Sequence, residues 1–245
     1  MVGPYRLVGR LGAGGMGIVY LARSPAGIPV ALKLIRPEYA ADATFRARFA
    51  REVATGQRVR GVCIAQYVDA DTDAERPYLV TEYVDGPGLG EVVEARGPMV
   101  GAQLQALAAG LAEGLVSLHR AGVVHRDLKP SNVLLAADAP KIIDFGIAHA
   151  GDATSMTRTG HVVGSAGWMA PEQAAGHRVT TAADVFAWAS TMAYAATGRP
   201  PFGEGQPAAI IYRVVHHEPD LSGVPPALVL GQEHARNLED ALETH

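Results

Sequence analysis

Residues 125–132 read His-Arg-Asp-Leu-Lys-Pro-Ser-Asn, which places an acid, two cations and a carboxamide within eight positions. Asp127 can accept a proton from a substrate hydroxyl or orient that hydroxyl. Lys129 can neutralise charge on a phosphoryl group in transfer, and Asn132 offers a neutral oxygen ligand for Mg²⁺. We interpret this segment as a phosphate-handling loop, against the alternative of a solvated loop with charges placed by chance.

A second acid follows at Asp144-Phe145-Gly146, directly after the apolar pair Ile142 and Ile143. A carboxylate here can bind a magnesium ion that bridges two phosphates. The distance of this acid from the loop at 125–132 is the reason that we do not treat either segment as accidental.

The glycines at 12, 14 and 17 form the pattern Gly12-x-Gly14-x-x-Gly17-x-Val19. Glycine lets a backbone approach phosphates without an intervening side chain. The pattern also occurs in dinucleotide-binding units, where a helix must follow, but here the next residues predict a strand. Taken alone, the pattern is also compatible with a glycine-rich hairpin turn.

Lys33 lies in an apolar run, Val30-Ala31-Leu32-Lys33, where an unpaired ammonium would be costly. It needs anionic partners, which a helix glutamate and nucleotide phosphates would supply. Glu52 lies 19 residues later on the next predicted helix and is the candidate glutamate. The alternative for Glu52 is a solvated surface charge, since several arginines are nearby.

The apolar and turn patterns predict a strand-rich first part and a helical second part. Strands are expected at 5–11, 18–23, 29–35, 64–69 and 77–82, and helices at 42–55, around 104–118 and at 181–197. Asp42 can cap the first helix. We expect an α+β fold with two lobes, residues 1–84 and 85–245, and a cleft between them.

Composition narrows the class of protein. The 245 residues are 48% hydrophobic and 19% charged with a net charge of −4, so nucleic acid and anionic lipid are not expected as primary partners. The single cysteine, Cys63, favours a buried apolar role and a cytosolic location. The run 185–196 spans 12 residues, short of the roughly 20 that cross a bilayer.

The ordered motifs resemble the protein kinase family. GxGxxGxV, VALK, HRDLKPSN, DFG and Ala170-Pro171-Glu172 occur in the family's order and spacing, over roughly residues 5 to 220. The chain is most similar to the bacterial branch of eukaryotic-like (Hanks-type) Ser/Thr kinases. Lysine two positions after Asp127 favours serine and threonine over tyrosine as acceptors. The resemblance implies the bilobal kinase fold, ATP and Mg²⁺ as cofactors, with Mn²⁺ as an alternative metal, and proteins as substrates.

The resemblance also implies a role for individual residues. Lys33, paired with Glu52, would hold the α- and β-phosphates, Asp127 would be the catalytic base assisted by Lys129, and Asn132 and Asp144 would bind magnesium. Asp184 would brace the catalytic loop. Thr81 would be the gatekeeper, and Glu82 and Val84 would supply hinge backbone hydrogen bonds. The remaining nucleotide contacts would come from Leu11, Gly12, Gly14, Gly17, Val19, Ala31 and Leu134.

Regulation is expected between DFG and APE. In similar kinases the arginine before the catalytic aspartate, here Arg126, pairs with a phosphate on this segment. We predict autophosphorylation at Thr157 or Thr159, against the alternative of an unmodified polar loop. Ser165 lies nearer APE and is interpreted as structural.

The chain departs from the family in two places. Residues 222–245 are short for the two helices that usually end the lower lobe, so we expect an atypical, shortened lobe in which only Arg236 remains as a partner for Glu172. Gly56 stands where similar kinases carry a larger side chain that links the lobes, and we expect a loosely held helix there.

Three functions are therefore compared. An active kinase leads, because the five central residues are present. A nucleotide-binding pseudokinase or scaffold is the main alternative, and a small-molecule phosphotransferase is disfavoured by the APE segment. We expect a cytoplasmic domain, or the cytosolic part of a longer membrane-anchored protein. A homodimer through the N-lobe is an open expectation from relatives.

Overall fold

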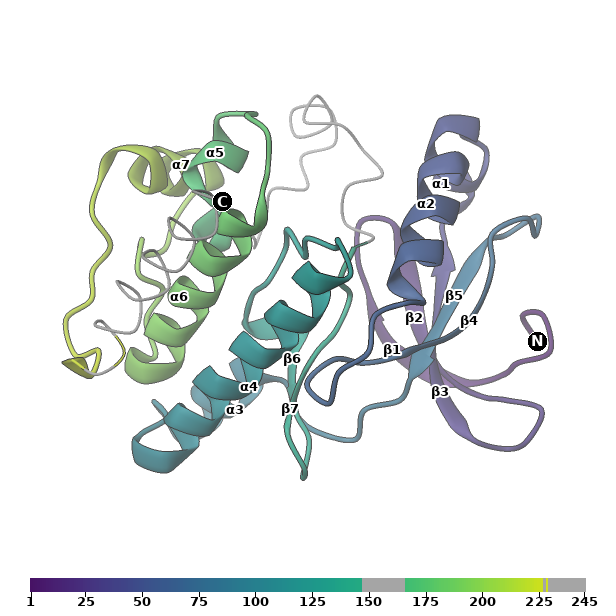
Figure 1. Cartoon of the computed structure of the whole chain (residues 1–245), viewed down its shortest axis with the longest axis horizontal. Helices are drawn as coiled ribbons and strands as arrows, with labels where there is room; N and C mark the ends of the chain where they lie inside the picture. Colours follow the sequence, from purple (N-terminus) through teal and green to yellow (C-terminus); the bar gives the residue numbers. More distant parts are fainter. Residues whose placement is uncertain (147–165, 227, 229–245) are drawn as a thin grey trace.

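The structure is a computed structural model that describes residues 1–146, 166–226 and 228. The chain forms a strand-rich lobe, which carries both α1 and α2, and a mainly helical lobe (Figure 1). The polypeptide passes from one to the other between the end of β5 at Glu82 and the start of α3 at Leu89. This is the α+β arrangement expected from the sequence.

The first lobe is built on one antiparallel sheet of five strands in the order β1-β2-β3-β5-β4. The strands are β1 (Arg6–Ala13), β2 (Gly17–Arg23), β3 (Pro29–Ile35), β4 (Tyr67–Asp71) and β5 (Tyr78–Glu82). The predicted bounds of β3 are confirmed, and β4 begins three residues later than the expected start at 64.

The two faces of this sheet have different roles, because side chains alternate along a strand. Val30, Leu32 and Leu34 face a small apolar cluster that closes the outer side of the sheet. Ala31 and Lys33 therefore project from the opposite face. The register carries that alternation across the sheet, since Val19 pairs with Lys33 and Thr81 pairs with Ala31.

Two helices cover the sheet, α1 (Pro37–Ala40) and α2 (Ala43–Gly56). The carboxylate of Asp42 accepts hydrogen bonds from the backbone N–H groups of Thr44 and Phe45, which confirms the predicted cap. Phe45, Phe49 and Val53 are buried at spacings of four residues, so one face of α2 packs inward.

The second lobe contains α3 (Leu89–Arg96), α4 (Gly101–Arg120), α5 (Pro171–Ala174), α6 (Thr181–Thr197) and α7 (Pro207–His216). A small hairpin, β6 (Val133–Leu135) with β7 (Pro140–Ile142), and two 3₁₀ turns, η1 (Pro130–Asn132) and η3 (Ala166–Trp168), complete it. The bounds of α6 are those predicted, whereas the sequence analysis missed the shorter helices α3, α5 and α7.

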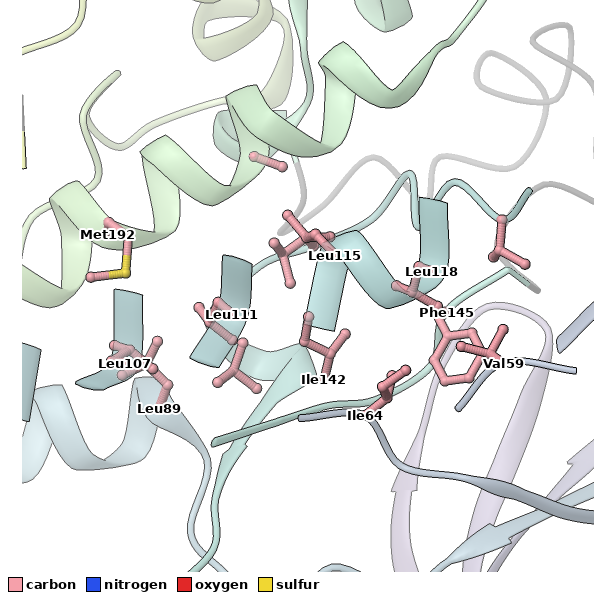
Figure 2. Close-up of a cluster of buried hydrophobic side chains, with 14 of the residues drawn as sticks. Val59, Ile64, Leu89, Leu107, Leu111, Leu115, Leu118, Ile142, Phe145 and Met192 are labelled. Carbon is pink, nitrogen blue, oxygen red and sulfur yellow. The ribbon is translucent and has the colours of Figure 1, made fainter. Parts of the chain in front are cut away.

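A continuous apolar core runs from the second lobe into the first. It follows the buried leucines of α4, includes Ile142 of β7, and reaches Phe145, Ile64 and Val59 (Figure 2). Ile142, Phe145 and Ile64 are at most 1% exposed. The same apolar body thus positions the loop before β6 and the acid that follows β7.

The link between the lobes is made by the ring of Tyr67. This ring stacks on Phe145 with centroids 4.6 Å apart, and its hydroxyl donates a 2.6 Å hydrogen bond to the carbonyl oxygen of Phe145. Gly56 lies against the same ring, so closely that an added Cβ would collide with it. The side chain missing at Gly56 is therefore replaced in space by an aromatic ring from β4.

This packing predicts that Gly56→Ala is destabilising, although alanine is the better helix former. Tyr67 is buried and hydrogen-bonded, so it cannot yield easily, and overpacking of this kind costs about 1–3 kcal/mol. The free energy of unfolding, measured by urea denaturation, should fall by that order.

The control is a double-mutant cycle with Tyr67→Ala. Once the ring is removed, Gly56→Ala should cost nothing further. Additive effects of the two substitutions would contradict the proposed contact.

Candidate active site

The loop at 125–132 is held from below by Asp184, which is fully buried on α6. Its carboxylate accepts hydrogen bonds from the backbone N–H groups of His125 (2.8 Å) and Arg126 (2.7 Å). The imidazole of His119 on α4 contacts the same carboxylate at 2.8 Å. The predicted bracing role of Asp184 is confirmed, and His119 is a partner that the sequence did not reveal.

Within the loop, three predicted residues converge on one point. The ammonium of Lys129 lies 2.7 Å from Asp127 Oδ2. The side-chain amide of Asn132 donates to the backbone oxygen of Asp127 at 2.7 Å and approaches its Oδ2 at 3.3 Å. An acid, a cation and a carboxamide therefore lie within hydrogen-bonding distance, as a group that transfers phosphate from ATP to a hydroxyl requires.

Asp144 lies opposite this group at the end of the β6–β7 hairpin, with a left-handed backbone (φ 58°) that is costly for a residue other than glycine. Lys33 Nζ lies 3.0 Å from Asp144 Oδ1. Desolvation acts to raise the pKa of Asp144, but the ammonium of Lys33 more than offsets it and holds the pKa below its ordinary value. Asp144 is thus an ionised ligand available for a cation.

The expected ion pair between Lys33 and Glu52 is not formed in this structure. Lys33 is engaged by Asp144 instead, and Glu52 Oε2 is buried with no hydrogen-bond partner among the described residues. Burial raises the pKa of Glu52 to about 7. The positive charges of Arg126, Arg48 and Arg51 lower this pKa, but by less than burial raises it. The prediction of this pair is therefore corrected, because the carboxylate of Asp144 lies within reach of the lysine and binds it in place of Glu52.

The glycine loop is tethered at its tip by Arg36, a residue that the sequence analysis did not single out. Its guanidinium donates a 3.1 Å hydrogen bond to the carbonyl oxygen of Gly14, and its backbone N–H donates to Met16 at 2.9 Å. A Cβ added at Gly12 or Gly14 would meet no atom within 4 Å. This open backbone has room for phosphates, which side chains there would occupy.

The predicted adenine contacts lie on the inner face of the sheet and at the passage between the lobes. Ala31 pairs with Thr81 across β3 and β5, and a backbone bridge from Gly88 holds Leu134. Leu11, near the end of β1, is 49% exposed. Among the described backbone hydrogen bonds, none uses the N–H group of Val84.

The carbonyl of Glu82 accepts a long 3.3 Å bond from the Thr81 hydroxyl. The Glu82 carboxylate also lies 3.5 Å from Lys141 Nζ on β7, which connects the end of β5 to the second lobe. This contact was not predicted, because nothing in the local sequence around Lys141 indicates it.

The residues present fit ATP with magnesium. Asn132 uses its amide nitrogen on Asp127, which leaves its carbonyl oxygen for a metal, and Asp144 supplies a carboxylate. Two hard oxygen ligands complemented by phosphates and water are what Mg²⁺ prefers. Among the described residues no group of three or more acidic, histidine or cysteine side chains could hold a metal ion by itself.

Some predicted features lie outside the described residues. These are the phosphorylation candidates Thr157 and Thr159, the neighbouring Ser165, and Arg236 as a partner for Glu172. Arg126 is described, and Gln173 donates to its carbonyl oxygen at 2.9 Å, a contact that ties the APE segment to the catalytic loop.

Comparison with known proteins agrees with this geometry. The family model described as a protein kinase domain matches residues 5–232. The probable serine/threonine-protein kinase PkwA of Thermomonospora curvata is 52% identical over 227 residues, which are 93% of this chain and 31% of PkwA. Serine/threonine-protein kinase AfsK of Streptomyces coelicolor is 50% identical over 228 residues, 93% of this chain and 28% of AfsK.

Among solved structures, the kinase domain of Mycobacterium tuberculosis PknI superposes with a TM-score of 0.69 at 30% identity, covering 91% of this chain and 82% of that one. The chain spans less than a third of the length of PkwA and AfsK.

The buried carboxyl of Glu52 predicts a pH dependence of stability. Its folded pKa near 7 lies above its ordinary value of 4.5, so the folded state holds an extra proton between these two pH values. This stabilisation is fully present below pH 4.5 and is lost as the pH rises through 7. The free energy of unfolding should therefore fall over that interval, and fall less in Glu52→Gln.

The exposed Glu38→Gln is the matched control and should keep the wild-type slope. Urea denaturation at about pH 5 and about pH 8 measures both slopes. Identical slopes for wild type and Glu52→Gln would rule out the raised pKa.

The tether from Arg36 predicts an effect on nucleotide affinity. Arg36→Ala frees the tip of the glycine loop, so ordering it over phosphates must cost additional entropy. One exposed hydrogen bond of about 0.5–1.5 kcal/mol corresponds to roughly two- to tenfold weaker binding of ATP with magnesium. Titration calorimetry measures the dissociation constant. The exposed Glu75→Gln should leave it unchanged, and so should Arg36→Ala if the tether has no role.

Proposed function

Since this chain belongs to the protein kinase family, we propose that it transfers the γ-phosphate of ATP to serine or threonine hydroxyls of proteins. The observation that carries the proposal is the convergence of Asp127, Lys129 and Asn132 within hydrogen-bonding distance, facing the Lys33–Asp144 pair. Relatives that are named serine/threonine-protein kinases support the same activity. The substrates and partners of these relatives are not assigned to this chain.

ATP with magnesium would supply the activated phosphoryl group and the charge that neutralises its oxygens. Asn132 and Asp144 would hold the metal. The glycine loop, kept in place by Arg36, would cover the phosphates, while Leu11, Val19, Ala31 and Leu134 would enclose the adenine. Mn²⁺ has the same preference for oxygen ligands and is an alternative ion.

Asp127 would receive or orient the proton of the substrate hydroxyl. Lys129 Nζ lies 2.7 Å from Asp127 Oδ2 and is placed to neutralise charge on the phosphoryl group in transfer. A lysine at this position, two residues after the acid, is the feature that favours serine and threonine as acceptors.

Phosphoryl transfer in this site requires Lys33 to exchange its partner Asp144 for other anions. Its bond to Asp144 occupies a carboxylate that the metal needs. With Asp144 holding the metal, Lys33 would be free to pair with phosphates and with Glu52, whose Oε2 is buried without a hydrogen-bond partner among the described residues. The cost of leaving Glu52 unpaired then becomes a driving force for the rearranged site.

The regulatory proposal is autophosphorylation at Thr157 or Thr159. It is supported by the fixed backbone of Arg126, which is held by Asp184 and Gln173 on its two sides. A phosphothreonine adds nearly two negative charges and three strong acceptors, which suits a guanidinium.

A nucleotide-binding scaffold is the second candidate. The Lys33–Asp144 pair favours it, because a site that kept this pair would bind nucleotide weakly and transfer nothing. Binding without transfer separates the two functions.

Substrates and oligomeric state are part of the same proposal. Protein substrates follow from the kinase activity, and a homodimer through the N-lobe follows only from resemblance. Within the described residues no helix is long and apolar enough to span a bilayer.

Purified chain with ATP and magnesium should phosphorylate itself and a generic basic protein, and Asp127→Asn should lower the rate by about 10²- to 10⁴-fold. Radiolabel transfer measures the rate, and phosphoamino-acid analysis should find phosphoserine or phosphothreonine. The exposed Asp73→Asn is the matched control, with wild-type activity expected.

Equal rates for wild type and Asp127→Asn would refute the assignment of this residue. An absence of transfer in wild type, with ATP binding intact, would favour the scaffold.

A further inference from the structure

An aromatic pair lies where α6 meets η3. The side chain of Tyr194 is 9% exposed, and its ring meets that of Trp168 at 87° with centroids 5.6 Å apart. Within the described part of the chain, no residue forms a hydrogen bond with the Tyr194 hydroxyl. A tyrosine buried to this extent usually has a partner for its hydroxyl, so this group is placed to bind a ligand.

Two carboxylates act on the same hydroxyl, that of Glu94 on α3 and that of Glu204 between α6 and α7. Burial raises the pKa of Tyr194, and the negative charges of Glu94 and Glu204 raise it further. Both glutamates are exposed, and neither forms an ion pair with another described residue. Two like charges near one group repel each other, and a cation between them would relieve that repulsion.

The arginines on either side of Glu204 in the chain do not pair with its carboxylate. Arg199 lies 3.7 Å from Asp220 and donates to the carbonyl oxygen of Ser222 at 2.9 Å. The guanidinium of Arg213 donates to the backbone oxygen of Glu204 at 2.8 Å. This bond holds the segment between α6 and α7 in place and leaves the carboxylate to a cation from another molecule.

The carboxylate on α3 lies next to the catalytic loop. A Cβ added at Gly90 would lie 3.7 Å from the Cβ of Pro130, so α3 packs closely against the residues that follow Asp127. Glu94 comes four residues after Gly90 and therefore shares its face of the helix. The negative charge of Glu94 is thus held on the side of α3 that borders the catalytic loop.

The aromatic pair is tied to the same loop from its other side. Trp168 ends η3, directly before the segment that begins α5. Gln173 of α5 donates to the carbonyl oxygen of Arg126, the residue before Asp127, at 2.9 Å. A substrate that brings its hydroxyl to Asp127 must therefore pass close to this aromatic pair and to the two carboxylates.

We infer that the acidic–aromatic surface formed by Glu94, Glu204, Tyr194 and Trp168 binds a lysine or arginine side chain of the protein substrate, close in sequence to the acceptor hydroxyl. Arginine fits best, because its guanidinium can donate to both carboxylates and to the tyrosine oxygen while its flat face lies against an aromatic ring. The inference rests on the proposed function, and it names the substrate class as serine or threonine next to a basic residue.

The experiment measures kcat/KM of the full chain, with ATP and magnesium, for a series of short peptides. Each peptide has one threonine in a background of alanine and glycine, and an arginine is moved through successive positions on either side of it. At one of these positions, arginine should raise kcat/KM about tenfold over the peptide without arginine, the gain expected for one charge-assisted hydrogen bond.

Substitutions in the surface test its part in this preference. In Glu94→Gln/Glu204→Gln, the ratio of kcat/KM with and without arginine should fall from about ten to about one. Glu94→Lys should reverse the preference toward a peptide that carries glutamate in place of arginine. The matched control is Glu75→Gln, which removes an exposed glutamate from the first lobe and should keep the wild-type ratio.

A wild-type ratio near one at every position, or a ratio that survives Glu94→Gln/Glu204→Gln, would overturn the inference. Failure of the proposed function gives a different result, since the wild type would then phosphorylate no peptide of the series. In that case fluorescence anisotropy of the same labelled peptides, with ADP and magnesium present, tests the surface without phosphotransfer. The dissociation constants should show the same tenfold preference for arginine in wild type and its loss in the double variant.

Discussion

The contact between Tyr67 and Phe145 is the constraint on which the rest of the site depends. The stacked rings and the 2.6 Å hydrogen bond join β4 of the first lobe to the residue that follows Asp144. Burial raises the pKa of Tyr67 well above its ordinary value, so the hydroxyl remains a donor at any physiological pH. Because Asp144 precedes Phe145, this contact also fixes the carboxylate that Lys33 reaches from the sheet.

Ion pairs and charge-assisted hydrogen bonds complete the arrangement of the site. The inner face of β3 brings the partly buried ammonium of Lys33 to the cleft, and the catalytic loop brings the ammonium of Lys129 to Asp127. Asp184 is buried beneath the loop and accepts hydrogen bonds from the backbone N–H groups of His125 and Arg126. These bonds hold Arg126 at a φ of 67°, which is unfavourable for a residue other than glycine. The site is assembled except for one exchange, in which Lys33 leaves Asp144 for phosphates and Glu52.

The sequence predicted what local pattern controls. The strand β3 was predicted from an apolar run that follows the turn at Gly27, and α6 from an apolar run that stops at Gly198. The catalytic loop was found because its residues are contiguous. It did not predict α7, a helix of 10 residues in which only Val214 is buried. The partner of Lys33, the role of Tyr67 beside Gly56 and the tether from Arg36 were missed, since each joins residues far apart in the chain whose distances depend on packing.

The most direct measurement of the central claim is a crystal structure of the chain with magnesium and a non-hydrolysable ATP analogue. The account predicts a metal bound by Asn132 and Asp144, with Lys33 within ion-pair distance of both the phosphates and Glu52. A nucleotide in the cleft with the Lys33–Asp144 pair intact, no metal at Asn132, and Glu52 still unpartnered would contradict it.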